Sequence, residues 1–155
     1  MHNWKQDRIK AAQTNQNPMV MVNMRSGFAV IGDTQFLPGY CVLLPTEKWP
    51  SLEKMPLALR SDYLLDMSLI GDAIVDVCQP LRVNYSIYGN TDTYLHAHLF
   101  PRYDWEPAER IPHPVWQYPQ EKWTDEQEQF QEATHGALRD KLTKKLEEKM
   151  KAAYM

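Results

Sequence analysis

The sequence predicts an α+β fold in which an antiparallel sheet of about five strands packs against a long central helix and a C-terminal helix. The 155 residues, 43% of them apolar, are enough for one compact domain and too few for two. Short apolar runs follow one another too closely for helical crossovers, which favours antiparallel pairing. Two longer stretches repeat their apolar residues at helical spacing. We therefore expect a single domain over residues 1–155, with its core at about 19–103.

The first part of the chain predicts one short helix and three strands. Residues 4–17 contain acceptable helix-forming residues and end at an Asn-Pro step, which stops a helix. The apolar runs at 19–24 and 28–31 are separated by a turn that contains Ser-Gly. A Pro-Gly turn precedes the third run at 40–44. These three runs predict a meander of antiparallel strands.

The middle of the chain predicts the long central helix and two further strands. The helix covers residues 56–79 and ends before Pro80. Its apolar stripe is expected to comprise Leu57, Leu64, Met67, Ile70, Ile74 and Val77. Three acids are assigned to its solvated face: Asp62, Asp66 and Asp76. The runs at 81–87 and 94–100 are the fourth and fifth predicted strands.

The last part of the chain predicts an ordered loop followed by a helix. Residues 104–120 contain prolines throughout, which excludes a regular element, but their aromatic side chains indicate an ordered segment. Residues 124–155 are expected to form the C-terminal helix. Thr124 is its predicted N-cap, in a capping box with Gln127. Acids near the start and lysines near the end match the helix dipole.

Composition excludes several classes of function. The formal net charge is −3, from 17 basic and 20 acidic side chains, so binding to a long nucleic acid has little electrostatic support. No apolar run approaches the roughly 18 residues of a membrane span, and the first residues lack the apolar core of a secretory signal. Cys41 and Cys78 have no metal-like spacing and are expected to be buried reduced thiols. We expect a cytoplasmic protein.

The segment 94–102 carries the chemistry. Because a strand alternates its side chains, Leu95, Ala97 and Leu99 share one face. The other face comprises Tyr94, His96, His98 and Phe100. Two imidazoles side by side have three interpretations: surface histidines, a metal site, or catalysis by histidine on phosphorus. The metal interpretation needs a third ligand, for which the candidates without a recognisable spacing are Glu106, Glu109, His113 and His135.

The surrounding residues favour catalysis on phosphorus. The segment resembles the signature of the histidine triad family, His-φ-His-φ-His-φ-φ, which is often followed by Pro-Arg. His96 aligns with the central, nucleophilic histidine of that family and His98 with the third. Tyr94 stands where the first histidine would be, which is a departure from the pattern. The resemblance covers roughly residues 19–103 and extends to the diadenosine polyphosphate hydrolase-like branch.

This resemblance implies further site residues. Gly89, Asn90 and Thr91 lie where the family contacts the phosphate, and Asn84 lies where an amide commonly sits near the phosphates. Asp33 is implied to accept from the ribose hydroxyls, although it is one residue closer to the following proline than the family's acid. Apolar residues of the first strands, Phe28 or Ile31, would enclose the base. For Arg102 we favour a structural role, for Trp105 and Trp116 core or interface packing, and for His113 and His135 a surface position.

The implied activity is hydrolysis or transfer at the α-phosphate of dinucleoside polyphosphates or related nucleotidyl conjugates. His96 would form a covalent nucleotidyl-histidine, while His98, Asn90 and Thr91 would face the non-bridging oxygens. Since Tyr94 breaks the triad, the alternative is a nucleotide-binding protein with little or no catalysis. The resemblance also implies a homodimer. No metal or other cofactor is expected, and a metal-dependent enzyme is the third interpretation. The leaving group stays open: a second nucleotide, an amine or a sugar phosphate.

Overall fold

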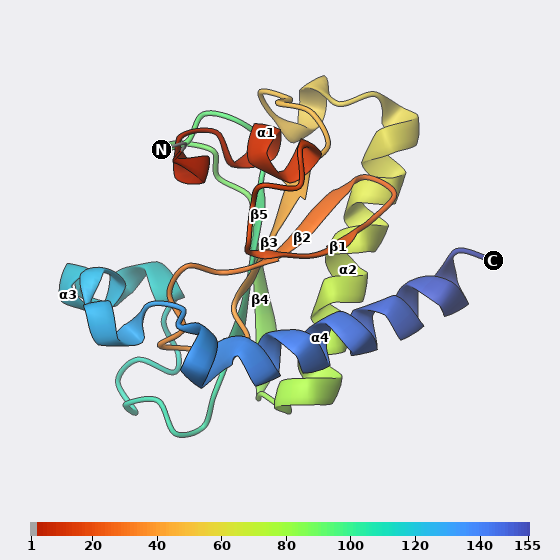
Figure 1. Cartoon of the computed structure of the whole chain (residues 1–155). Coiled ribbons are helices and arrows are strands. Elements are labelled where there is room, and N and C mark those ends of the chain that lie inside the picture. Colours follow the sequence, from red (N-terminus) through yellow and green to blue (C-terminus); the bar gives the residue numbers. More distant parts are fainter. Residues whose placement is uncertain (1–2) are drawn as a thin grey trace.

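A five-stranded antiparallel sheet is the centre of the computed structural model, which describes residues 3–155. The strand order is β1-β2-β3-β5-β4 (Figure 1). The strands are β1 (Val20–Asn23), β2 (Gly27–Ile31), β3 (Cys41–Pro45), β4 (Arg82–Ser86) and β5 (Ala97–Arg102). The first three form the expected meander, and β5 pairs with both β3 and β4. The α+β class, the sheet, the central helix and a C-terminal helix are confirmed.

The helix α2 (Leu57–Cys78) covers one face of the sheet. Its buried residues include Tyr63, Ile70 and Ile74, and the Tyr63 hydroxyl donates to the Leu43 carbonyl at 2.8 Å. The aliphatic side chains of the histidine segment join the same core: Leu95, Ala97 and Leu99. Burial of these residues under α2 leaves the histidine face of β5 on the opposite side of the sheet, as the alternation predicts.

The predicted stripe of α2 is partly wrong. Leu57 is 73% exposed and Leu64 is 42% exposed, whereas Asp66 is fully buried. The Asp66 carboxylate accepts hydrogen bonds from the backbone N–H and hydroxyl of Ser26, at 2.8 and 2.7 Å, and from the Tyr154 hydroxyl. These donors replace water, so the carboxylate is tolerated between the apolar turns of the helix.

The start of the predicted C-terminal helix is also wrong. Thr124 is the last residue of a short helix, α3 (Gln120–Thr124), and its hydroxyl donates to the Gln120 carbonyl. The main helix, α4 (Glu132–Ala153), begins eight residues later and packs against α2 and β1. The chain between them is held by backbone hydrogen bonds from Gln35 N–H to the Glu128 carbonyl and from Phe130 N–H to the Asp33 carbonyl, both 2.6 Å. Pairing with residues 33–35 therefore replaces the predicted first turns of the helix.

Two smaller elements differ from the predicted boundaries. The N-terminal helix consists of a 3-10 turn (Trp4–Gln6) and α1 (Arg8–Gln13), and the Asp7 side chain caps α1. The strand expected at 94–100 begins at Ala97 and ends at Arg102. Tyr94 and the next two residues are irregular, and Leu95 N–H donates to the Trp49 carbonyl at 2.7 Å. The local departure from a strand matters for the orientation of His96.

The proline-rich loop after β5 is ordered, as predicted, and Arg102 ties it to the sheet. The buried Arg102 guanidinium donates to the Glu106 carboxylate at 2.9–3.2 Å, to Asn84 Oδ1 at 3.1 Å and to the His113 carbonyl at 2.7 Å. The carboxylate of Glu106 also accepts from the Tyr118 hydroxyl at 2.6 Å. The guanidinium of Arg102 is thus engaged by acceptors of the protein itself, which agrees with the structural role expected for it.

Neither tryptophan of the loop is buried in a core, and the other expectation for them, packing in an interface, stays a prediction. Trp105 is 58% exposed and stacks on Tyr103, and Trp116 is 40% exposed. Cys41 is buried and Cys78 half-buried, and both are free thiols. None of the helices within residues 3–155 combines the length and the apolarity that crossing a membrane requires.

Candidate functional site

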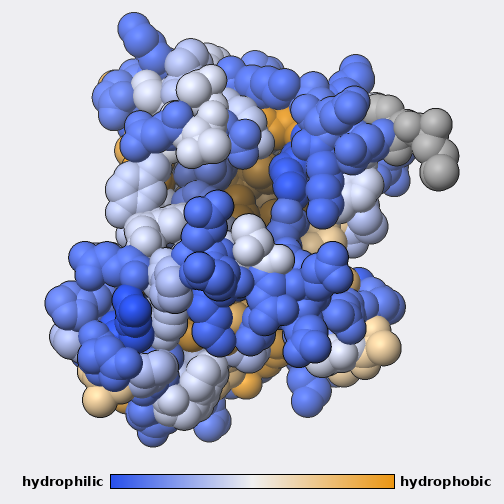
Figure 2. All heavy atoms as spheres, turned by 90° about the vertical axis from the view of Figure 1, so that its left-hand side faces the viewer, coloured by the Kyte–Doolittle hydropathy of each residue, from blue (hydrophilic) through white to orange (hydrophobic). Residues whose placement is uncertain are grey.

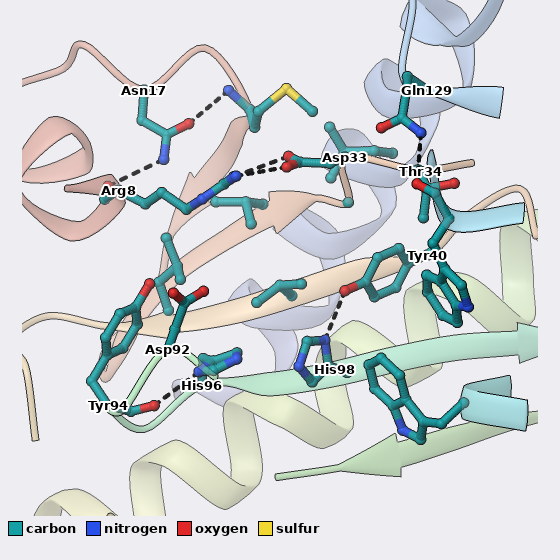
Figure 3. Close-up of a pocket in the computed structure, with 18 residues that line it drawn as sticks. Arg8, Asn17, Asp33, Thr34, Tyr40, Asp92, Tyr94, His96, His98 and Gln129 are labelled. Carbon is teal, nitrogen blue, oxygen red and sulfur yellow. Dashed lines mark hydrogen bonds and ion pairs between the residues drawn. The ribbon is translucent and has the colours of Figure 1, made fainter. Parts of the chain in front are cut away.

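Two adjoining pockets meet at the histidines. The first has a volume of about 300 Å³ and the second about 450 Å³, and they share Asp92, His96, His98 and Trp116 as lining residues. Figure 3 shows both imidazoles beneath the first pocket, on the sheet side turned toward Tyr40 and Asp33. On the side of the molecule turned away from α2, Figure 2 shows a hollow with apolar side chains at its bottom and polar side chains around it.

The backbone orients the ring of His96. Its Nδ1 lies 2.8 Å from the carbonyl oxygen of Tyr94. A carbonyl oxygen can only accept, so Nδ1 carries a proton, and the neutral ring therefore has its lone pair on Nε2. The irregular backbone before β5 makes this contact, which any residue at position 94 can supply. The Tyr94 phenol itself is half-buried beside His96, and burial followed by the charge of Asp92 raises its pKa.

The opposite tautomer is favoured at His98. Its Nδ1 lies 2.7 Å from the hydroxyl of Tyr40, and within residues 3–155 this atom is the only hydrogen-bond partner of that hydroxyl. Burial raises the pKa of Tyr40 well above its ordinary value, so the hydroxyl keeps its proton and donates to Nδ1. Burial, and then the neighbouring His96, lower the pKa of His98 to about 4. At neutral pH His98 is therefore uncharged with its proton on Nε2.

The two imidazoles thus present complementary groups to the pockets. His96 offers a lone pair on Nε2, and His98 offers an N–H donor on Nε2. Their ring centroids are 4.8 Å apart, with the planes at 73°. A nucleophile next to a donor is the arrangement required for attack on a centre that carries a negatively charged oxygen.

The first pocket combines an aliphatic lining with one ion pair. Its aliphatic residues are Met19, Val30, Ile31, Val42 and Leu44. Two residues were expected to enclose the base. Ile31 lines this pocket, whereas Phe28 is buried in the main core. Both carboxylate oxygens of Asp33 accept from Arg8, at 3.0 and 2.6 Å (Figure 3). A carboxylate has about four lone-pair positions, so Asp33 retains accepting capacity on the pocket side.

The second pocket contains most of the predicted phosphate-binding residues. Gly89, Asn90 and Thr91 line it together with His96 and His98. Gly89 has a φ of +69°, in the region that favours glycine, and lets this loop turn. Asn84 is not brought to the histidines, because its amide oxygen accepts from Arg102 and it lines a separate groove.

Arg8, Tyr40 and Trp123 line the first pocket but were not assigned to the site from the sequence. Tyr40 carried a usable signal, since it lies two residues before Val42, which pairs with His98 across β3 and β5. Arg8 and Trp123 carried none, because their places depend on how α1 and α3 pack. The indole rings of Trp123 and Trp116 stack in parallel, with their centroids 5.2 Å apart.

The candidate metal ligands are not gathered at the histidines. Within residues 3–155, no three His, Cys, Asp or Glu side chains form a group that could hold a metal ion. Glu106 is engaged by Arg102 and Tyr118, and His135 accepts from the Gln131 N–H at the start of α4. His113 is exposed on the loop, as predicted.

Comparison with known proteins identifies the fold. No protein-family model matches the sequence, and no curated protein matches it significantly. A histidine triad protein from Marinobacter aquaeolei VT8 is 20% identical and has a TM-score of 0.69, over 83% of this chain and 88% of its own. A histidine triad protein from Sinorhizobium meliloti 1021 is 14% identical with a TM-score of 0.70, over 86% and 93%. A hypothetical histidine triad nucleotide-binding protein from Sulfolobus tokodaii strain7 is 10% identical with a TM-score of 0.68, over 90% and 91%. The chain has the fold of the histidine triad proteins.

Proposed function

We propose that this chain, with the fold of the histidine triad proteins, is a nucleotidyl hydrolase that attacks an α-phosphate through His96. One observation carries the proposal: two adjacent imidazoles are held in complementary tautomers where two pockets meet. The structural neighbours, one of which is described as nucleotide-binding, support a nucleotide ligand. Dinucleoside polyphosphates and related nucleotidyl conjugates are the proposed substrates.

The first step forms a covalent intermediate. The Nε2 lone pair of His96 attacks phosphorus in line. The bond from phosphorus to the leaving group breaks, and the leaving group takes its electron pair. His98 Nε2–H, Asn90 and Thr91 are the proposed donors to the non-bridging oxygens. Each such donor supplies about 2.7–4 kcal/mol of transition-state stabilisation, by analogy with oxyanion holes. Water then attacks phosphorus, the bond to His96 breaks, and a nucleoside monophosphate leaves.

The first pocket is the proposed nucleoside site. Its aliphatic lining suits the faces of a base, and Asp33 accepts from the ribose hydroxyls with the lone pairs that Arg8 leaves free. Tyr94 in place of the first histidine does not remove the support of His96, since that support comes from the backbone carbonyl. This contact favours a catalytic protein over one that only binds nucleotides.

A homodimer is proposed on the side of α2 and β4. β4 is an edge strand of the sheet, and it packs beside α2. Exposed apolar side chains occur on and next to both elements: Leu64, Leu65, Val75, Leu81 and Tyr85. Surfaces of this kind mark interfaces. Sedimentation equilibrium is expected to give twice the monomer mass, and a single monomeric species at micromolar concentration would contradict the dimer.

Steady-state kinetics on diadenosine polyphosphates and adenosine phosphoramidates test the activity. His96→Ala is expected to lower kcat at least ~10³-fold while nucleotide affinity stays within a few fold, because a transition-state interaction is lost. His98→Ala should cost roughly 10²–10³-fold, since other donors remain. His113→Ala, at an exposed histidine away from both pockets, is the matched control and should behave as wild type.

Two results would contradict the proposal. Turnover that survives His96→Ala would remove His96 as the nucleophile. A wild-type protein that binds AMP but turns over none of these substrates would favour the alternative, a nucleotide-binding protein without catalysis.

A further inference from the structure

Arg8 and Asp33 form a bidentate ion pair in the wall of the first pocket. Each η-nitrogen of Arg8 donates to a different carboxylate oxygen, with Nη1 3.0 Å from Oδ1 and Nη2 2.6 Å from Oδ2 (Figure 3). The two residues are 25 positions apart in the sequence, on α1 and just after β2. Both are partly buried and both line the pocket. Two parallel charge-assisted hydrogen bonds fix the carboxylate in one orientation.

The backbone and the guanidinium of Arg8 are both held in place. Its helix is capped by Asp7, whose side chain accepts a backbone N–H of the first turn at 3.1 Å and pairs with Lys48 at 3.0 Å. The Arg8 carbonyl accepts from Asn17 Nδ2 at 3.2 Å. The guanidinium carbon lies 5.1 Å from the centroid of the Trp4 ring, within the range of a cation–π contact. Arg8 is therefore a fixed part of the pocket wall.

The ion pair limits what else the carboxylate of Asp33 can accept. An ionised carboxylate has about four lone-pair positions, shared equally between its two oxygens. Arg8 occupies the position on each oxygen that faces the guanidinium. The positions that remain lie on opposite outer sides of the carboxylate and point away from each other. Among residues 3–155, no other group donates to these oxygens.

The remaining lone pairs suit one ribose hydroxyl at a time. The two hydroxyls of a ribose are neighbours on one face of the sugar, so they reach a free carboxylate together only from the side that Arg8 occupies here. A neutral hydroxyl does not displace Arg8, because the guanidinium brings a charge and forms two hydrogen bonds to this carboxylate at once. One hydroxyl therefore donates to an outer lone pair of Asp33, and the other lacks this acceptor.

We propose that Arg8 sets the ribose specificity of the site by restricting Asp33 to a single ribose hydroxyl. This inference rests on the proposed function, in which Asp33 binds the ribose. It widens the substrates to nucleotidyl conjugates that lack the other hydroxyl. Arg8 acts through Asp33, so it is a positioning residue.

Calorimetric binding of four ligands tests this restriction: AMP, its 2′-deoxy and 3′-deoxy analogues, and its 2′,3′-dideoxy analogue. AMP is the product of the proposed reaction, so its binding is measured without turnover. In wild type, removal of one hydroxyl is expected to weaken binding about 10-fold, since a hydrogen bond to a charged group is lost. Removal of the other should change binding less than about 3-fold, because it has no charged acceptor. The dideoxy analogue should match the weaker of the two single-deoxy analogues.

Substitution of Arg8 should remove the restriction. In Arg8→Ala the whole carboxylate is open to the ribose, so the loss of either hydroxyl should weaken binding about 10-fold relative to AMP. Arg8→Lys keeps the charge but cannot form the bidentate pair, and it should also make both hydroxyls count. In Asp33→Ala all four ligands should bind within about 2-fold of one another, because the charged acceptor is gone.

Arg139 supplies a matched control. Its guanidinium forms the same kind of bidentate pair with Glu132, at 2.6 and 2.7 Å, but neither residue lines the first or the second pocket. Arg139→Ala should therefore keep the wild-type ratios for all four ligands. Each ratio is taken against AMP in the same variant, so a general change of affinity cancels.

The outcomes separate this inference from the hydrolase. Equal penalties for the two single-deoxy analogues in wild type would overturn the role of Arg8 and leave the hydrolase intact, as would a wild-type pattern that persists in Arg8→Ala and Arg8→Lys. The expected pattern in binding, without turnover of any phosphoramidate or diadenosine polyphosphate, would support the role of Arg8 and refute the hydrolase. Failure of AMP to bind wild type would refute both.

Discussion

Acidification from pH 7 to pH 4 is expected to destabilise the folded protein through His98. The neutral ring accepts from the Tyr40 hydroxyl at Nδ1, and a protonated ring has no lone pair there. Burial, together with the neighbouring His96, lowers the pKa of His98 to about 4, against an ordinary value of 6.5. The unfolded chain therefore binds this proton first, and the folded state loses relative stability as the pH falls.

The size of the effect follows from the two pKa values. The contribution of neutral His98 is fully present above about pH 6.5 and is lost progressively toward pH 4. Between pH 7 and pH 4 it amounts to about 3 kcal/mol of unfolding free energy. Such a loss is a large fraction of the stability of a typical domain.

Urea denaturation of wild type and His98→Gln at both pH values measures this contribution. The carboxylates titrate alike in the two proteins, so the difference between them isolates His98. Wild type should lose about 3 kcal/mol more than His98→Gln. His113→Gln, at an exposed histidine, should follow wild type. Parallel losses in wild type and His98→Gln would refute the assignment of His98 as a buried neutral ring.

Three further predictions concern the carboxylates and Tyr94. Asp66→Ala leaves several buried donors unpaired and should cost about 3 kcal/mol or more of stability in urea denaturation. Asp76→Ala, on the exposed side of the same helix, should stay close to wild type, and equal losses would contradict the burial argument. Asp33→Ala should raise KM about 10-fold with little change in kcat, and an unchanged KM would exclude ribose binding. Tyr94→His should leave kcat equal or higher, because the backbone carbonyl orients His96 in both proteins; a 10-fold drop would contradict this.

The histidine face could be predicted from sequence because it depends on local alternation. Leu95, Ala97 and Leu99 are buried under α2, and His96 and His98 open into the pockets on the other side. Strand period determines this outcome without knowledge of any distant contact. The same logic, extended from Val42 to Tyr40, would have found the partner of His98.

Features that depend on distant partners could not be predicted. The burial of Asp66 requires donors from Ser26, 40 residues earlier, and Tyr154, 88 residues later. The helix predicted to start at Thr124 does not form there, because residues 128–130 form backbone hydrogen bonds with residues 33–35 instead. Local helix propensity contains no information about this pairing. The exposure of Trp116 depends on how Arg102 anchors the loop. In each case a tertiary contact outweighs a correct local signal.

The covalent intermediate on His96 is the most direct test of the central claim. Wild-type protein is mixed with an adenosine phosphoramidate, quenched rapidly in alkali, in which phosphorus–nitrogen bonds to histidine survive, and analysed by peptide mass spectrometry. One adenylyl group is expected on the peptide that contains His96, forming and decaying at rates that account for turnover. Turnover without this adduct, or with the adenylyl group on another residue, would contradict the account.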